Sequence, residues 1–230
     1  MRAVLLLFPI TAASEAAKAA QEARIASQGQ QARPRCSAAL RETGPCRLLQ
    51  RAACCSRAPL RACGCNAHAR CFAAQVSDKV WFTKQTVGNA CGTIGLLHAA
   101  ANLASEAPPA AGSWLAGFLA RTAGMDSAAR AQALESDDSL DAAHAAAASE
   151  GQSAAPADEE EVNLHFVAFV HVDGGLYELD GRKPAPVRHG NTDASSLLAD
   201  AVAVVQREFV AHADGNVNFN IVALAPPMDD

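Results

Sequence analysis

The sequence predicts an α+β fold in which helices wrap a central, mainly antiparallel sheet. Three observations lead to this fold class. Strand-like apolar runs and alanine-rich helical segments follow one another in a mixed order along the 230 residues. Two β-rich runs, at 162–172 and 176–180, flank an Asp-Gly turn and predict a hairpin. Half of the residues are apolar, so the chain is able to bury a core as one domain over 1–230.

The N-terminal region predicts one strand and one helix. Residues 3–8 (AVLLLF) form a continuous apolar run of strand length that stops at Pro9, which predicts a buried, central strand. A short secretory signal is the competing interpretation, because one Arg and an apolar stretch precede small residues there. Residues 13–27 (ASEAAKAAQEARIAS) predict an alanine-rich helix that ends at Gly29.

Residues 31–71 differ in composition from the rest of the chain. They hold seven of the eight Cys and eight Arg against a single acid, Glu42, and no apolar period of 3.6 or 2 persists in them. Their charge of +7 leaves −12 on the remainder, because the whole chain carries −5. An acidic body argues against nucleic acid as the main ligand.

The middle of the chain predicts a short strand at 78–83 (DKVWFT) and a helix at 91–104 (CGTIGLLHAAANLA). Ile94, Leu97 and Ala101 form one apolar stripe along that helix.

Three further helical segments and one loop follow. Short helices are expected at 113–121 and at 126–135, the second of which opens at the capping residue Asp126. Residues 138–148 predict an alanine-rich turn of helix. Residues 149–161, with Gly, Pro, Ser and four consecutive acids, predict a long mobile loop.

The C-terminal third adds the 162–180 hairpin, a helix at about 193–211 and a closing strand at 219–225. No apolar run reaches the roughly 18 residues that a membrane-spanning helix needs. We therefore expect no membrane segment.

Cys91 is the candidate nucleophile. It lies at the start of the helix expected at 91–104, where the helix dipole and unpaired backbone N–H groups stabilise a thiolate. Ala90 and Gly92 leave room for a substrate backbone. A lone cysteine is more often a buried structural residue, so the assignment depends on whether a base lies within reach.

Hairpin geometry supplies that base. A two-residue turn at 173–174 makes paired residue numbers sum to 347, so that Val167 lies opposite Asp180. His165 then lies on the same face as Asp180, within reach of a carboxylate–imidazole hydrogen bond. A carboxylate on one ring nitrogen supports the imidazolium that forms when the other nitrogen takes the thiol proton.

An acyl transfer also needs a donor for the oxyanion, and Gln85, six residues before Cys91, is the candidate. The other histidines are expected to be structural or on the surface. His171, next to the turn, is the alternative base, while His98 and His189 are interpreted as structural.

These residues carry a resemblance to the ubiquitin carboxyl-terminal hydrolases, which are papain-like cysteine peptidases. The matching pieces recur in family order: AVLLLFPI (3–10), IASQGQ (25–30), KQT (84–86), NACGTIGLLHA (89–99), EGQ (150–152), LHFVAFVHVDGGLYELDGRKPAPVRHG (164–190) and FNIVALA (219–225). The resemblance implies the papain-like fold, with Cys91 as nucleophile, His165 as general base, Asp180 as its orienting residue and Gln85 as oxyanion donor.

The resemblance also implies that 149–161 is the crossover loop under which the substrate's tail threads, which would limit leaving groups to small adducts or unfolded peptides. Two features depart from the family's pattern. The N-terminal segment that family members carry before AVLLLF is missing, and 31–77 stands where the family has a short connection. We expect this insertion to be a stretch read through in a gene model or a disordered segment.

Two other interpretations of the insertion remain open. A zinc module would use Cys54, Cys55, Cys63, Cys65, His68 and Cys71, but their spacings are not those of paired structural zinc ligands. A disulfide knot would require export of the protein.

The sequence as a whole predicts a thiol hydrolase that cleaves (iso)peptide, ester or thioester bonds at the C-terminus of ubiquitin or a ubiquitin-like protein. We expect a monomer that needs no metal or cofactor, located in the cytoplasm with the nucleus as an additional location. The alternative is a ubiquitin-binding module with impaired catalysis, since the missing N-terminal segment would leave the substrate poorly seated.

Overall fold

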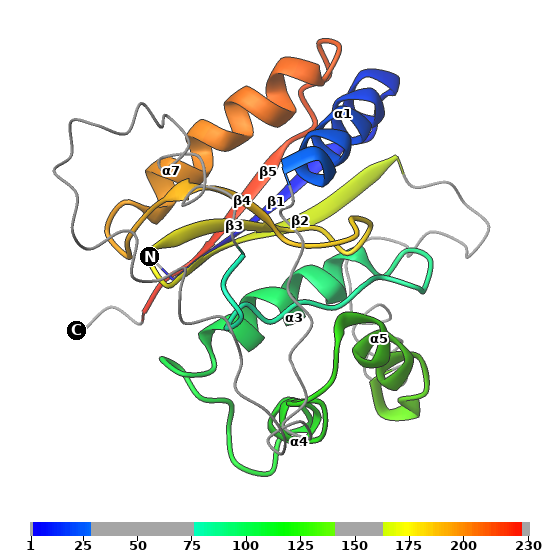
Figure 1. The fold of residues 1–230 in the computed structure, drawn as a ribbon, viewed down its shortest axis with the longest axis vertical. Helices are drawn as coiled ribbons and strands as arrows, with labels where there is room; N and C mark the ends of the chain where they lie inside the picture. The colour runs from blue at the N-terminus through cyan, green and yellow to red at the C-terminus, as the bar shows by residue number, and fades with distance from the viewer. Residues whose placement is uncertain (1, 29–75, 141–162, 227–230) are drawn as a thin grey trace, which may run out of the picture.

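The fold is built on a five-stranded sheet with the strand order β4-β3-β2-β1-β5 (Figure 1). This computed structural model describes residues 2–28, 76–140 and 163–226. The strands span Ala3–Pro9 (β1), Leu164–Val172 (β2), Gly175–Leu179 (β3), Val187–Asn191 (β4) and Asn220–Leu224 (β5). All neighbouring pairs among them are antiparallel, as predicted.

β1 is an internal strand, which explains its continuous apolar run. It pairs with β2 on one side and with β5 on the other. Val4, Leu6 and Phe8 belong to one core cluster, whereas Ala3 and Leu5 belong to a second cluster on the opposite face. The central strand predicted at 3–8 is therefore confirmed.

The β2–β3 hairpin has the predicted register. Val172 pairs with Gly175 and Ala168 with Leu179, so that paired numbers sum to 347. Asp173 and Gly174 both have positive φ, 48° and 73°, as a two-residue type I′ turn requires.

Helices cover both faces of the sheet (Figure 1). On one face lie α1 (Ala12–Gln28) and α7 (Leu197–Val204). On the other lie α3 (Cys91–Leu103), α4 (Trp114–Arg121) and α5 (Ser127–Glu135). The helices predicted at 13–27, 91–104, 113–121 and 126–135 are thereby confirmed.

Capping side chains mark three of the helix starts. Thr11 and Ser14 exchange side-chain-to-backbone hydrogen bonds at the start of α1, in the manner of a capping box. Ser113 caps α4, and the Asp126 carboxylate accepts the N–H groups of the first turn of α5, as the sequence predicts.

The short strand predicted at 78–83 is wrong, because this segment hydrogen-bonds to side chains of α3 rather than to a neighbouring strand. Asn102 accepts the Trp81 N–H and donates to the Trp81 carbonyl, both at 2.8 Å. Nε2 of His98 lies 3.0 Å from the carbonyl oxygen of Thr83. The side chains satisfy the polar backbone groups that a sheet would otherwise pair.

Two C-terminal details also differ from the prediction. β4 falls in a region without a predicted strand. The helix expected from 193 begins only at Leu197, because the Asp193 carboxylate accepts the N–H groups of Ser195 and Ser196 in a preceding turn. The helix then continues through a π-helical turn, Val205–Phe209, and a final 3₁₀ turn.

Several predictions from the sequence concern residues that the structure does not describe. Most of the insertion at 31–77, the loop at 149–161 and most of the helical turn at 138–148 lie outside the described ranges, although residues 76–77 are described and residues 138–140 are helical. The closing strand predicted at 219–225 is confirmed by β5.

Replacing Asn102 with Ala should lower the free energy of unfolding. The change deletes both bonds to Trp81 and a third to the His98 carbonyl, and we expect a loss of about 1–3 kcal/mol. Urea unfolding would measure it. Gln132→Ala, at an exposed position of α5, is the matched control, and equal stabilities of the two variants would contradict the role of Asn102.

Candidate active site

Cys91 is the first residue of α3 and the only cysteine among the residues that the structure describes. The residue before it, Ala90, is the N-cap and offers no side-chain acceptor to the first N–H groups of the helix. The backbone N–H groups of Gly92 and Phe166 hydrogen-bond to the Cys91 sulfur instead. The helix start and β2 therefore meet at the thiol.

His165 and Asp180 form a buried pair, as the predicted strand pairing of the hairpin and the alternation of its side chains imply. Nε2 of His165 lies 2.7 Å from Oδ1 of Asp180, and the two side chains are 3% and 2% exposed. The Arg182 N–H also donates to Oδ1 at 2.9 Å, which fixes the carboxylate. Because Nε2 is committed to Asp180, Nδ1 is the ring nitrogen left for the hydrogen bond with Cys91.

The contact between Cys91 and His165 favours a thiolate–imidazolium pair. Burial raises the pKa of Cys91, but the hydrogen bond from His165 and those from the backbone outweigh it, so that the pKa falls below the ordinary thiol value of 9.0. Burial likewise lowers the pKa of His165, but Asp180 and Cys91 together raise it to about 9. Asp180 stays ionised, because His165 and Lys183 offset its burial and hold the pKa of its carboxyl below the usual value.

Gln85 lies beside the corner of the chain that follows Asp180. Its backbone N–H donates to the Gly181 carbonyl at 3.0 Å, and its side-chain Nε2 donates to the Val87 carbonyl at 3.0 Å. Its side-chain oxygen is buried and has no hydrogen-bond partner. Because an amide NH₂ group has two hydrogens, the bond to Val87 leaves one of them for a substrate. The loop that carries Gln85 leads to Cys91.

Gly181 permits this close approach. A Cβ atom at position 181 would lie 2.8 Å from Cβ of Gln85 and 2.9 Å from Cγ2 of Ile94. The absence of a side chain here lets three segments meet at the site: the Gln85 loop, the first turn of α3 and the Asp180 corner.

The remaining histidines lie elsewhere. His171 is at the hairpin turn, where its ring accepts the Gly174 N–H at 3.2 Å in an exposed position. His98 is fully buried and stacks on Phe82 at 5.0 Å, and burial lowers its pKa to about 4. His189 lies on β4 rather than in a loop, with Nε2 2.7 Å from the Glu178 carboxylate.

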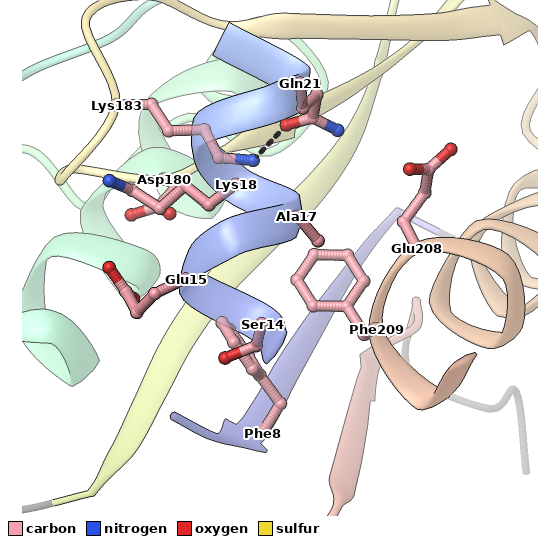
Figure 2. Close-up of a pocket in the computed structure, with 10 residues that line it drawn as sticks. All are labelled: Phe8, Ser14, Glu15, Ala17, Lys18, Gln21, Asp180, Lys183, Glu208 and Phe209. Carbon is pink, nitrogen blue, oxygen red and sulfur yellow. Dashed lines mark hydrogen bonds between the residues drawn. The ribbon is translucent and has the colours of Figure 1, made fainter. Parts of the chain in front are cut away.

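The sequence reasoning missed a buried polar cluster next to Asp180. Lys183 donates to Glu178 and to Gln21 of α1, and all three side chains are 6% exposed or less. The alternation of side chains along a strand could have predicted this neighbour, because Glu178 lies two positions before Asp180 and therefore on the same face of the sheet. Figure 2 shows α1 crossing over the corner, with a small pocket lined by Asp180, Lys183, Glu208, Phe8, Phe209 and one side of α1.

The described residues contain no group of three or more His, Cys, Asp or Glu arranged to hold a metal ion. The zinc ligands considered for the insertion lie outside the described ranges. None of the described helices is both long enough and apolar enough to cross a membrane.

Several known proteins are similar to this chain in sequence. The sequence model of the family described as "Ubiquitin carboxyl-terminal hydrolase, family 1" matches residues 58–211. The chain is 49% identical over 150 residues to human ubiquitin carboxyl-terminal hydrolase isozyme L1 and 45% identical over 149 residues to ubiquitin carboxyl-terminal hydrolase 3 of Arabidopsis thaliana. Each match covers 65% of this chain, but only 66% and 62% of those relatives, so the chain spans less than two thirds of their length.

Solved structures include one with the same fold. It is the Trichinella spiralis UCH37 catalytic domain bound to ubiquitin vinyl methyl ester, with a TM-score of 0.53 and 23% sequence identity over 96% of this chain and 75% of that one. The similarity confirms the α+β, papain-like fold class predicted from the sequence.

Gly181→Ala should destabilise the site, because the new methyl group would overlap the Gln85 backbone segment and Ile94. We expect about 1–3 kcal/mol of lost stability, which thermal unfolding would measure. Gly88→Ala is the matched control, since a Cβ there meets nothing within 4 Å. A Gly181→Ala protein as stable as the Gly88→Ala protein would refute the close packing.

His165→Ala should raise the pH at which Cys91 becomes reactive. His165 lowers the pKa of the parent thiol from the ordinary value of 9.0, so the thiolate forms at a lower pH than it does in a free cysteine. Without the imidazolium, burial raises the pKa, so that iodoacetamide should alkylate Cys91 at least about tenfold more slowly at pH 7. Peptide mapping by mass spectrometry separates Cys91 from the other cysteines.

The control for this measurement is His171→Ala, which removes an exposed histidine away from the thiol. Its alkylation profile should match that of the parent chain. If His165→Ala also matched the parent, the thiolate–imidazolium pair would be excluded.

Proposed function

The chain belongs to the ubiquitin carboxyl-terminal hydrolase family, and on this premise we propose that it is a cysteine hydrolase that cleaves bonds to the C-terminal carbonyl of ubiquitin. The observation that carries the proposal is the continuous contact from Cys91 through His165 to Asp180. Family membership supplies the substrate class, since the matching family model and the relatives are ubiquitin carboxyl-terminal hydrolases.

In the first step, the Cys91 thiolate attacks the carbonyl carbon of the C-terminal residue of ubiquitin. His165, already protonated by transfer from the thiol, gives its proton to the leaving amine, alcohol or thiol as the bond to the acyl carbon breaks. A water molecule then attacks the thioester, with neutral His165 accepting the water's proton, and Cys91 is released. Asp180 keeps the ring oriented and stabilises its charged form throughout.

Oxyanion stabilisation falls to Gln85 and the Cys91 backbone N–H. The role of Gln85 is supported by its position at the Gly181 contact and by the amide hydrogen that its bond to Val87 leaves unused. Such a donor acts on the charge that develops on the carbonyl oxygen, and losing one typically costs about 10²–10³ in rate.

We further propose that the natural leaving groups are small adducts or unfolded peptides. This rests on the segment 149–161, which the resemblance assigns to a crossover above the substrate tail. A crossover that closes over the tail would admit a single extended chain and exclude a folded domain.

The decisive experiment incubates the whole chain with ubiquitin that carries a C-terminal electrophile. We expect a covalent adduct on Cys91, seen as a mass increase of one ubiquitin, because lowering the thiol pKa increases the fraction of reactive thiolate. Cys91→Ala should abolish the adduct.

Cys71→Ala is the matched control, as it removes one of the seven other cysteines, and it should leave labelling unchanged. A parent chain that binds ubiquitin without being labelled would overturn the hydrolase proposal and favour a binding module. Labelling that persists in Cys91→Ala would show that another cysteine reacts.

A further inference from the structure

A buried charged cluster adjoins the candidate active site and takes no part in the proposed reaction. Lys183 Nζ donates to Oε1 of Glu178 and to Oε1 of Gln21. The second oxygen of Glu178 is 2.7 Å from Nε2 of His189. The exposed fractions of Glu178, Lys183 and Gln21 are 0%, 5% and 6%. Burying charged groups lowers the stability of the fold unless the charges are paired, so a buried cluster of this kind suggests a role in function.

The strand geometry places Glu178 beside Asp180, which relates the cluster to the candidate active site. Glu178 and Asp180 are two residues apart on the hairpin, and side chains alternate along a strand, so both carboxylates lie on the face that carries His165. Two neighbouring buried carboxylates repel each other, which favours protonation of one of them. Lys183 is the buried cation at this point, and its backbone N–H closes the corner by donating to the Asp180 carbonyl at 2.9 Å.

We propose that Lys183 is a positioning residue for the reaction: its ammonium group offsets the charge of Glu178, so that Asp180 remains an anion and holds His165 as the charged partner of Cys91. The inference rests on the proposed roles of these three residues. It also links the site to α1, because Lys183 reaches Gln21 there, and Figure 2 shows this bond beside Asp180.

The other charged groups around the corner have partners of their own. Arg182 pairs with Glu15 at 2.8 Å, Lys18 with Glu22 at 3.3 Å and Arg207 with Glu208 at 2.9 Å. These pairs are partly exposed, where water and salt weaken their field. Inside the protein, His165 and Lys183 act on Asp180, and Asp180 acts on the buried His98. Cys91 contacts His165, and Glu178 pairs with Lys183 and with His189.

The test measures the pH dependence of iodoacetamide alkylation of Cys91 by peptide mapping. Lys183→Met removes the cation, and Lys183→Gln removes it while keeping a hydrogen-bond donor for Glu178 and Gln21. Both should move the alkylation midpoint up by about one pH unit or more, because Asp180 is then less ionised and supports His165 less. Below the midpoint this is about a tenfold slower reaction.

Charge compensation separates this role from simple packing. Glu178→Gln alone should leave the midpoint near that of the parent, and Lys183→Met combined with Glu178→Gln should return it there. Arg182→Met is the matched control, since it removes a neighbouring but exposed cation. Circular dichroism confirms that each variant is folded.

The inference is overturned if folded Lys183→Met and Lys183→Gln proteins keep the parent midpoint, or if the double variant stays shifted like Lys183→Met. The alkylation assay needs no ubiquitin, so the two proposals fail separately. A parent chain that ubiquitin electrophiles do not label, but whose variants show these shifts, would overturn the proposed function and leave the role of Lys183 standing.

Discussion

The hydrogen bond between His165 and Asp180 exists because β2 and β3 pair in one particular register. The two-residue turn at Asp173–Gly174 sets that register, and a slip by one residue would send Asp180 to the opposite face. Everything else at the site is arranged around this bond. The Cys91 thiol is drawn into an ion pair by the imidazole that Asp180 supports, and Gly181 brings the Gln85 loop against the same corner.

Much of the fold could be predicted from local patterns. The apolar run of β1, the alanine-rich α1 and the Asp-Gly turn each carry their own signal, and the structure confirms them. The predicted strand at 78–83 fails for a physical reason: its β-rich residues are satisfied by Asn102 and His98, whose positions depend on a helix that lies later in the chain. The conformation of that segment is set by contacts with side chains distant in sequence, which periodicity does not reveal.

The contacts at the site were predictable to the extent that strand parity determines them. Side-chain alternation along the two strands predicted that His165 lies beside Asp180, and the position of Cys91 at the start of a helix identified it as the candidate nucleophile. The same parity placed Glu178 next to Asp180, but the cation that balances it comes from Lys183, beyond the strand end, and its further partner Gln21 comes from a helix more than 150 residues away in sequence. No periodic pattern in the sequence predicts either of these two contacts of Lys183.

The central position of β1 has a consequence for biosynthesis. This strand is synthesised before its two neighbours, β2 and β5, which lie more than 150 and 200 residues later in the chain. The apolar AVLLLFP segment therefore stays unpaired until β2 and β5 have been synthesised, and during that time it exposes the nascent polypeptide to aggregation. During that interval Cys91 is an ordinary thiol, because its imidazole partner has not yet been made.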